Sequence, residues 1–287
     1  MTVTTTQEYV LSLSCDDQVG IVAALTTELA AHGCNITESA QFWDRGSNRF
    51  FMRIGFTVPD GLDRTGVERA LQPIIDRFGM KTRLLDRSVK PKVIIMVSKF
   101  DHAMLHLLYQ IRVGWLNAEV AAIVSNHDDA ARIAAYEEVP FHHWAVTKDN
   151  KADQEARLLD LVRETGADLV ILARYMQILS NDLSNRLFGK IINIHHSFLP
   201  SFKGAKPYHQ AHARGVKLIG ATAHYVTPDL DEGPIIEQET VRVDHSGTAE
   251  DFVAQGRDIE ALVLSRAVKL HLEGRVMLNG SNTVVFD

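Results

Sequence analysis

The sequence predicts an α/β chain of two domains, and three observations lead to this prediction. Strand and helix patterns up to residue 86 follow the order β-α-β-β-α-β. A polar, basic stretch that contains a proline, residues 87–92, interrupts the patterns. Beyond it, continuous apolar runs alternate with amphipathic stretches, which is typical of a mostly parallel sheet covered by helices. We therefore predict a small domain over residues 1–86, a linker over 87–92 and a larger domain over 93–287.

The first domain begins with an alternation of apolar and polar residues that predicts a half-buried strand. Its expected elements are a strand over 9–14, a helix over 21–32, strands over 35–43 and 49–58, a helix over 63–77 and a strand over 81–85. Apolar residues at helical spacing, such as Ile21, Leu25 and Leu29, indicate the first helix, and Gly33 suits its end. This order of elements is that of a ferredoxin-like domain.

The second domain opens with five consecutive apolar residues over 93–97, as expected for a strand covered on both faces. Further strands are expected over 119–124, 168–173 and 190–194, and helices over 103–112, 154–165 and 248–272. Thr248, followed by acidic residues, suits the start of the last helix. The alternation of these elements predicts a Rossmann-like domain with a mostly parallel sheet.

Composition excludes several classes of protein. Of 287 residues, 46% are hydrophobic and 23% are charged, so the chain is neither a disordered tail, a collagen-like repeat nor a coiled-coil rod. The net charge of −6 argues against a nucleic-acid partner. No apolar run approaches the roughly 20 residues that span a bilayer, and the N-terminal residues lack the pattern of a signal peptide. Cys15 and Cys34 form no CxxC, so we expect a reducing, cytoplasmic setting and no disulfide framework.

Asn193 and His195 end a predicted buried strand, where ligands of open α/β sheets bind. Because strand side chains alternate, residues two apart lie on the same face. A carboxamide beside an imidazole can donate hydrogen bonds to a developing oxyanion. An isolated Asn-x-His is common, however, and most such pairs only close a strand.

A second candidate is the acidic turn that contains Asp231. A strand carrying His224 enters this turn and another strand leaves it. A carboxylate at the reversal could hold a water molecule or accept a proton. Aspartate and glycine favour turns in any case, so a solvated turn is the competing interpretation.

The sequence gives little support for a metal site, a phosphate-binding loop or a slot for a flat heterocycle. Thirteen histidines are present, but neither HExxH nor a zinc-type Cys/His spacing occurs, so no metal site is predicted. The loop over 97–103 has no glycine that would let backbone amides close on a phosphate. Residues 175–180 follow a buried strand, and either line a slot for a flat heterocycle or pack as an ordinary helix start.

Taken together, these segments resemble the formyltransferase family that uses 10-formyltetrahydrofolate, over the chain from about Pro91 to its end. The motifs that carry the resemblance are Asn193, His195, Ser197–Pro200, Lys203–Gly204, His224 and Asp231–Ile236. An Asn, a His and an Asp are catalytic in that family, and they match Asn193, His195 and Asp231. The resemblance further implies that His224 supports Asp231. It implies substrate contacts from Met176, Gln177, Ile178, Leu179, Ser197 and Gly204.

The first domain resembles an ACT domain, with residues 16–22 opening its first helix and Asn35 starting its second strand. Together with the glycine-free loop at 98–102 and the motifs at 195–198 and 206–210, this points to the deformylase branch of the family. The resemblance implies hydrolysis of 10-formyltetrahydrofolate to tetrahydrofolate and formate. Asn193 and protonated His195 would stabilise the oxyanion, while Asp231 would position the water and handle its proton.

The expected partner is therefore the folate substrate, with no further cofactor and no metal. The ACT-like domain implies an amino-acid effector, and its exposed strand edge favours a homo-oligomer. Two alternatives stay open from the sequence. One is formyl transfer onto an amine acceptor, and the other is a catalytically silent, folate-binding regulator.

Overall fold

The computed structural model describes residues 7–199 and 207–287, which form two compact units. The first unit extends to Lys90 and also includes Leu270–Asn279 and Val284–Asp287. The second comprises Pro91–Lys269 and Gly280–Thr283. The second domain expected over 93–287 therefore differs from the structure at its end, where most of the last residues belong to the first unit.

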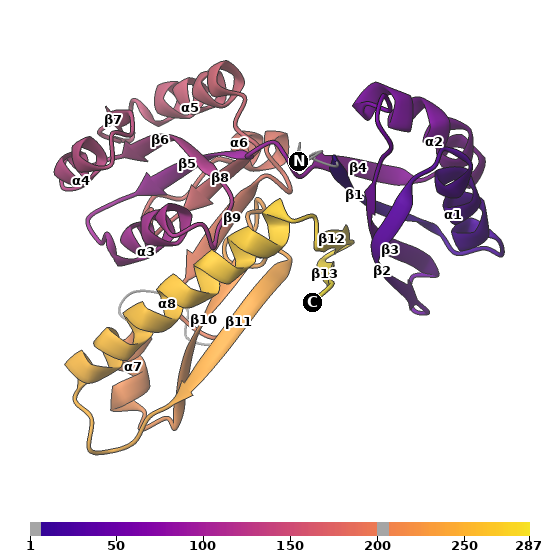
Figure 1. The fold of residues 1–287 in the computed structure, drawn as a ribbon. Coiled ribbons are helices and arrows are strands. Elements are labelled where there is room, and N and C mark those ends of the chain that lie inside the picture. Colours follow the sequence, from indigo (N-terminus) through magenta and orange to yellow (C-terminus); the bar gives the residue numbers. More distant parts are fainter. Residues whose placement is uncertain (1–6, 200–206) are drawn as a thin grey trace. The chain divides into compact units, whose positions relative to one another are not determined.

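The first unit has the ferredoxin-like order that the sequence predicts (Figure 1). Its elements are β1 (Glu8–Asp16), α1 (Ile21–Ala31), β2 (Asn35–Asp44), β3 (Arg49–Thr57), α2 (Arg64–Phe78) and β4 (Lys81–Asp86). The strands form an antiparallel sheet in the order β2-β3-β1-β4, with α1 and α2 on one face (Figure 1). Strand alternation gives β1 one set of buried apolar residues for these helices, among them Leu11 and Leu13.

The opposite face of this sheet is covered by the end of the chain. β3 is buried on both faces, and its Phe51 packs against Met277 of β12 (Val276–Asn279) and against Phe286. The strand β13 (Asn282–Val285) pairs with β12. The run Phe50-Phe51-Met52 is thus apolar without alternation because each face of β3 meets a different apolar layer.

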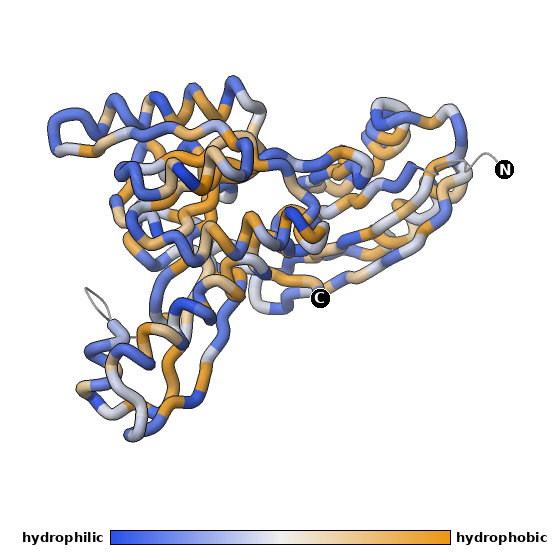
Figure 2. The backbone as a smooth tube through the Cα atoms, turned by 60° about the vertical axis from the view of Figure 1, so that its left-hand side comes forward, coloured by the Kyte–Doolittle hydropathy of each residue, from blue (hydrophilic) through white to orange (hydrophobic). Residues whose placement is uncertain are grey.

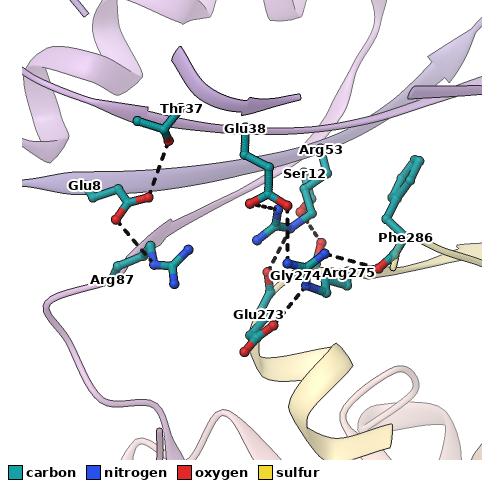
Figure 3. A network of polar contacts seen from close by, with 10 residues as sticks. All are labelled: Glu8, Ser12, Thr37, Glu38, Arg53, Arg87, Glu273, Gly274, Arg275 and Phe286. Atoms are coloured by element: carbon teal, nitrogen blue, oxygen red, sulfur yellow. Dashed lines mark hydrogen bonds and ion pairs between the residues drawn. The ribbon is translucent and has the colours of Figure 1, made fainter. Parts of the chain in front are cut away.

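Charged side chains fix this terminal segment to the sheet (Figure 3). Arg53 of β3 is 1% exposed, and its Nη1 lies 2.6 Å from Oε2 of Glu38 on the neighbouring β2. The other oxygen of Glu38 lies 3.2 Å from Nη2 of Arg275. Arg53 Nε donates to the carbonyl of Glu273, and Ser12 Oγ donates to that of Gly274. Glu38 therefore joins an arginine of the sheet to an arginine of the terminal segment.

Replacing Glu38 with glutamine is expected to destabilise the first unit by about 2 kcal/mol, because Arg53 would keep a buried charge without a carboxylate. The hydrogen bond from Arg53 is the main reason that the pKa of Glu38 lies below its ordinary value, and partial burial opposes it. The stabilisation is therefore present at neutral pH and is lost as acid protonates Glu38. Urea denaturation at several pH values measures it. Glu28→Gln is the control, because Glu28 is also 35% exposed but has His32 as its one ion-pair partner among the described residues. Equal effects of the two substitutions would contradict the prediction.

The second unit is built on a seven-stranded sheet in the order β11-β10-β9-β8-β5-β6-β7. Its strands are β5 (Lys92–Val97), β6 (Glu119–Ser125), β7 (Phe141–His143), β8 (Leu169–Leu172), β9 (Ile191–His195), β10 (Leu218–Tyr225) and β11 (Ile235–Arg242). The helices are α3 (His102–Arg112), α4 (Ala131–Tyr136), α5 (Lys151–Thr165), α6 (Asn181–Arg186), α7 (Pro207–Ala213) and α8 (Ala249–Leu272). Five adjacent strands, β9 to β7 in this order, are parallel, whereas β10 and β11 are antiparallel, so the predicted mostly parallel sheet is confirmed.

Hydrophobic residues concentrate in the strands of this sheet (Figure 2). Ile94 and Met96 pack in a cluster with Leu158 and Leu161 of α5, while Val93 and Ile95 are fully buried on the other face. The carboxyl ends of the parallel strands β5, β8 and β9 lie at the same edge of the sheet, as the parallel register requires. This edge is where the candidate site lies.

Candidate active site

Asn193 and His195 lie at the end of β9, and their neighbours on both sides are fixed by register. Asn193 is opposite Leu172 of the parallel β8 and opposite His224 of the antiparallel β10. Its Nδ2 atom lies 3.3 Å from Nε2 of His224. Asn193 and His224 thus come together because the strands pair, although the two residues are distant in the chain.

The hydrogen bonds of His224 define what its ring offers to Asn193. His224 Nδ1 lies 2.9 Å from the carbonyl oxygen of Tyr225, and a carbonyl can only accept. Nδ1 therefore carries a hydrogen, and in the neutral ring Nε2 accepts a hydrogen bond from the Asn193 amide. This bond uses one amide hydrogen of Asn193 and fixes the orientation of the other.

Asp231 lies in the turn between β10 and β11 and has a left-handed backbone, with φ of 57°. Its Oδ2 atom is 3.2 Å from His195 Nδ1, and its Oδ1 atom is 3.7 Å from His224 Nε2. Burial by itself raises the pKa of Asp231, but the hydrogen bond and charge of His195 outweigh it and hold the pKa well below its ordinary value. Asp231 is therefore a carboxylate at neutral pH.

His195 has one ring nitrogen paired with Asp231 and one that forms no hydrogen bond with any described residue. Its side chain is only 7% exposed, Nδ1 faces Asp231, and the buried Nε2 has no hydrogen-bond partner in the structure. Asn193, His195, His224 and Asp231 all line one cavity of about 240 Å³. An unsatisfied buried ring nitrogen in such a cavity is suited to contact a bound substrate.

The structure brings some of the expected substrate-contacting residues to this cavity and leaves others away from it. Met176, Gln177, Ile178 and Leu179 line it, and the side chains of Met176 and Ile178 are more than half exposed. Ser197 lines a separate, smaller hollow, and its carbonyl accepts a hydrogen bond from Thr222. Gly204 lies outside the residues that the structure describes.

Arg174 and His196 also line the cavity, although neither is among the site residues predicted from the sequence. The ring of His196 stacks on that of His195, with centroids 5.1 Å apart. Burial, together with the positive charges of Arg174 and His195, lowers the pKa of His196 to about 4, so that it is neutral near pH 7. A signal for Arg174 is present in the sequence, because an arginine directly follows the apolar strand 169–173.

Close backbone packing at Gly233 holds the turn that carries Asp231. A β-carbon at Gly233 would overlap the carbonyl oxygen of Tyr225 and would lie 3.2 Å from His224 Nδ1. The amide of Tyr225 also donates to the carbonyl of Pro234, so the two ends of the turn are tied together. Only glycine allows this approach without moving the backbone.

Replacing Gly233 with alanine is expected to destabilise the second unit by about 1–3 kcal/mol and to displace Asp231. Urea denaturation gives the loss of stability. The matched control is Gly46→Ala, because a β-carbon at Gly46 would meet only Asp44 Oδ1, at 3.4 Å. A Gly233→Ala variant as stable as the control would contradict this account of the turn.

Within residues 7–199 and 207–287, no helix is long and apolar enough to cross a membrane. The same residues contain no group of three or more His, Cys, Asp or Glu side chains arranged to hold a metal ion.

Comparisons with known proteins match both units. A family model described as formyl transferase matches residues 91–268, and one described as ACT domain matches residues 9–76. The chain is 50% identical over 280 residues to a formyltetrahydrofolate deformylase from Corynebacterium sp. (strain P-1), covering 96% of this chain and 97% of the relative.

Similar solved structures agree with these sequence matches. The crystal structure of a formyltetrahydrofolate deformylase from Burkholderia mallei ATCC 23344 superposes with a TM-score of 0.95 and 53% identity, covering 98% of this chain and 100% of that one. A glycinamide ribonucleotide transformylase 1 from Symbiobacterium toebii superposes with a TM-score of 0.65 and 28% identity, covering 71% of this chain and 98% of that one.

Proposed function

Since this chain belongs to the formyl transferase family and, within it, to the formyltetrahydrofolate deformylases, we propose that Asn193, His195 and Asp231 are its catalytic residues. The chain hydrolyses 10-formyltetrahydrofolate to tetrahydrofolate and formate. Water adds to the formyl carbon, and the bond between that carbon and N10 breaks. One proton of the water passes to N10, and the second is released to solvent when formate leaves as an anion.

Asn193 and His195 stabilise the oxyanion of the tetrahedral intermediate. One amide hydrogen of Asn193 bonds to neutral His224, and the second is left to donate to the oxyanion. Protonated His195 donates from Nε2, which has no other partner among the described residues. Both donors are fixed before substrate binds, by β9 itself and by the contacts to His224 and Asp231. Donors held in place in this way need no reorganisation as the charge develops.

Asp231 orients the imidazole of His195 and positions the attacking water. Its low pKa keeps it ionised, so that it holds Nδ1–H of His195 and favours the charged ring. The proton that the water loses passes to this carboxylate–imidazole pair and from it to N10 of the departing tetrahydrofolate. His224 lies against both Asn193 and Asp231 and so holds these two side chains in position relative to each other.

The observation that carries this assignment is the meeting of four polar side chains from β9, β10 and the following turn in one cavity lined by Met176–Leu179. The chemistry is tested by incubating the protein with 10-formyltetrahydrofolate without any amine acceptor. We expect formate and tetrahydrofolate to appear in equal amounts. Formate release only after an amine is added would contradict hydrolysis and favour transfer, and substrate binding without turnover would favour a regulator.

The first unit is proposed to regulate this activity and to join copies of the chain. An ACT domain suggests an amino-acid effector. β2 is an edge strand of its sheet, and Phe42 and Trp43 on it are about half exposed, which suits strand pairing with a second copy. A monomer by light scattering at micromolar concentration would contradict the homo-oligomer. We also propose a cytoplasmic location, in keeping with the free thiols of Cys15 and Cys34.

A further inference from the structure

Arg174 directly follows the short segment that leaves β8, and its backbone is held in an unusual conformation. Its φ is 65°, in the left-handed region that few non-glycine residues adopt. Among the described residues, four non-glycine residues have such a backbone, and two of these four, Arg174 and Asp231, line the cavity. Backbone strain of this kind is concentrated at functional sites, where the surrounding structure enforces it.

Glu260 of α8 holds Arg174 by charge but does not satisfy its hydrogen bonds. The Glu260 side chain is 1% exposed, one of its oxygens accepts from Tyr208 Oη at 2.8 Å, and the other lies 2.8 Å from His102 Nε2. Arg174 Nε lies 3.4 Å from that second oxygen. Burial raises the pKa of Glu260, but His102, Arg174 and Tyr208 together lower it, so the carboxylate is charged.

Two N–H groups of Arg174 consequently remain without an acceptor. Its side chain is 12% exposed, and the buried Nε and Nη1 atoms have no hydrogen-bond partner within residues 7–199 and 207–287. The Cζ atom of Arg174 lies over the ring of Phe100, 5.8 Å from its centroid, and this contact supplies no hydrogen-bond acceptor to the N–H groups. Buried polar groups are nearly always paired in native proteins, so unpaired ones call for a partner.

Arg174 is also the one permanently charged cation among the residues found to line the cavity in the described part of the chain. His195, with its unpartnered Nε2, lines the same cavity, and the neutral His196 stacks on it. Arg174 and His195 therefore line the same cavity, and each has a buried nitrogen without a hydrogen-bond partner among the described residues. An arginine and a histidine placed in this way match the two oxygens of a small carboxylate.

We propose that Arg174, positioned by Glu260, binds the carboxylate of formate as the reaction forms it, together with His195. This inference rests on the proposed function, because hydrolysis creates a one-carbon carboxylate where the formyl group was. An amine acceptor would carry the formyl group away and leave no such anion. The arginine thus provides a place for the product that is specific to water as the acceptor.

Product inhibition by sodium formate tests this proposal directly. In Arg174→Gln the inhibition constant for formate is expected to rise about tenfold to a hundredfold, while the KM for 10-formyltetrahydrofolate stays within about twofold. Arg174→Lys, which keeps the charge but not the fork of donors, is expected to recover part of the affinity. Arg257→Gln is the matched control, because Arg257 also lies over the Phe100 ring, at 5.2 Å, but is exposed and outside the cavity.

Glu260→Gln tests the positioning role. It keeps an acceptor for Tyr208 but removes the charge that holds Arg174, so formate inhibition should weaken while the KM for substrate changes little. Combined with Arg174→Gln it should weaken formate inhibition no further, because both changes act on one interaction. Additive losses in the double variant would show that Glu260 acts on formate binding independently of Arg174 and would overturn its positioning role.

The outcomes separate this proposal from the function on which it rests. If the wild-type protein releases formate without an acceptor but Arg174→Gln and Arg174→Lys are inhibited by formate as strongly as the wild type, the proposal is wrong and the hydrolysis stands. If Arg174→Gln loses tetrahydrofolate affinity instead of formate affinity, Arg174 binds a carboxylate of the folate, which also overturns the proposal. Absence of acceptor-free formate release by the wild type would remove the proposed function itself.

Discussion

Asp231→Asn is expected to lower kcat for formate release by about a thousandfold. Asparagine has nearly the same shape, but it carries no charge to favour protonated His195 and cannot take part in proton transfer. Because the pKa of Asp231 lies well below its ordinary value, the wild-type carboxylate stays ionised from about pH 5 to pH 8, and a large loss is expected throughout this range. Formate release measured across this range tests the prediction.

Asp229→Asn is a suitable control for this variant, because Asp229 lines the same cavity on the same turn but makes no contact with His195 or His224 in the structure. We expect it to keep most of the activity. Thermal unfolding and tetrahydrofolate binding of Asp231→Asn should stay close to those of the wild type. Activity retained in Asp231→Asn, or lost equally in Asp229→Asn, would remove Asp231 from the mechanism.

His195→Gln is expected to lower kcat by about a hundredfold to a thousandfold, the usual loss for one oxyanion donor. Its KM should change little, because the donor acts mainly on the intermediate. Steady-state rates at several substrate concentrations give kcat and KM.

His245→Gln serves as the control for this second variant, since His245 is an exposed histidine of the same unit and lies outside the cavity. Its kcat and KM should equal those of the wild type. If His195→Gln instead raises KM and leaves kcat unchanged, the ring binds substrate without stabilising the oxyanion, and the mechanism proposed above is wrong.

The main elements of both units could be predicted because their signals are local. Alternation over 9–14, helical spacing around Leu25, and the continuous apolar run at 93–97 each depend on residues a few positions apart. The structure confirms the β-α-β-β-α-β order and the mostly parallel sheet. The short helices α4, α6 and α7 escaped prediction, since six or seven residues give too few turns for a periodic pattern.

The candidate site was predictable only in part. Asn193 and His195 share one face of β9 because they are two residues apart, and the exit of a strand is an expected place for a ligand. Ser197, two positions further on, has left the strand, so alternation no longer determines where its side chain lies, and it contributes to a different hollow. Glu260 lies within an apolar stretch of α8, which could have indicated a buried charge but not its partner.

By itself, the sequence determined the two α/β units and the pair of donors at the end of β9, because strand alternation and helical periodicity act between near neighbours. Only the tertiary structure decided that Asp231 reaches His195, that His224 faces Asn193, and that the end of the chain covers the first sheet. It also decided that Glu260 faces Arg174 and leaves part of that arginine unpaired. These pairings join segments far apart in the chain, and they follow from strand register and packing, which no local pattern of residues specifies.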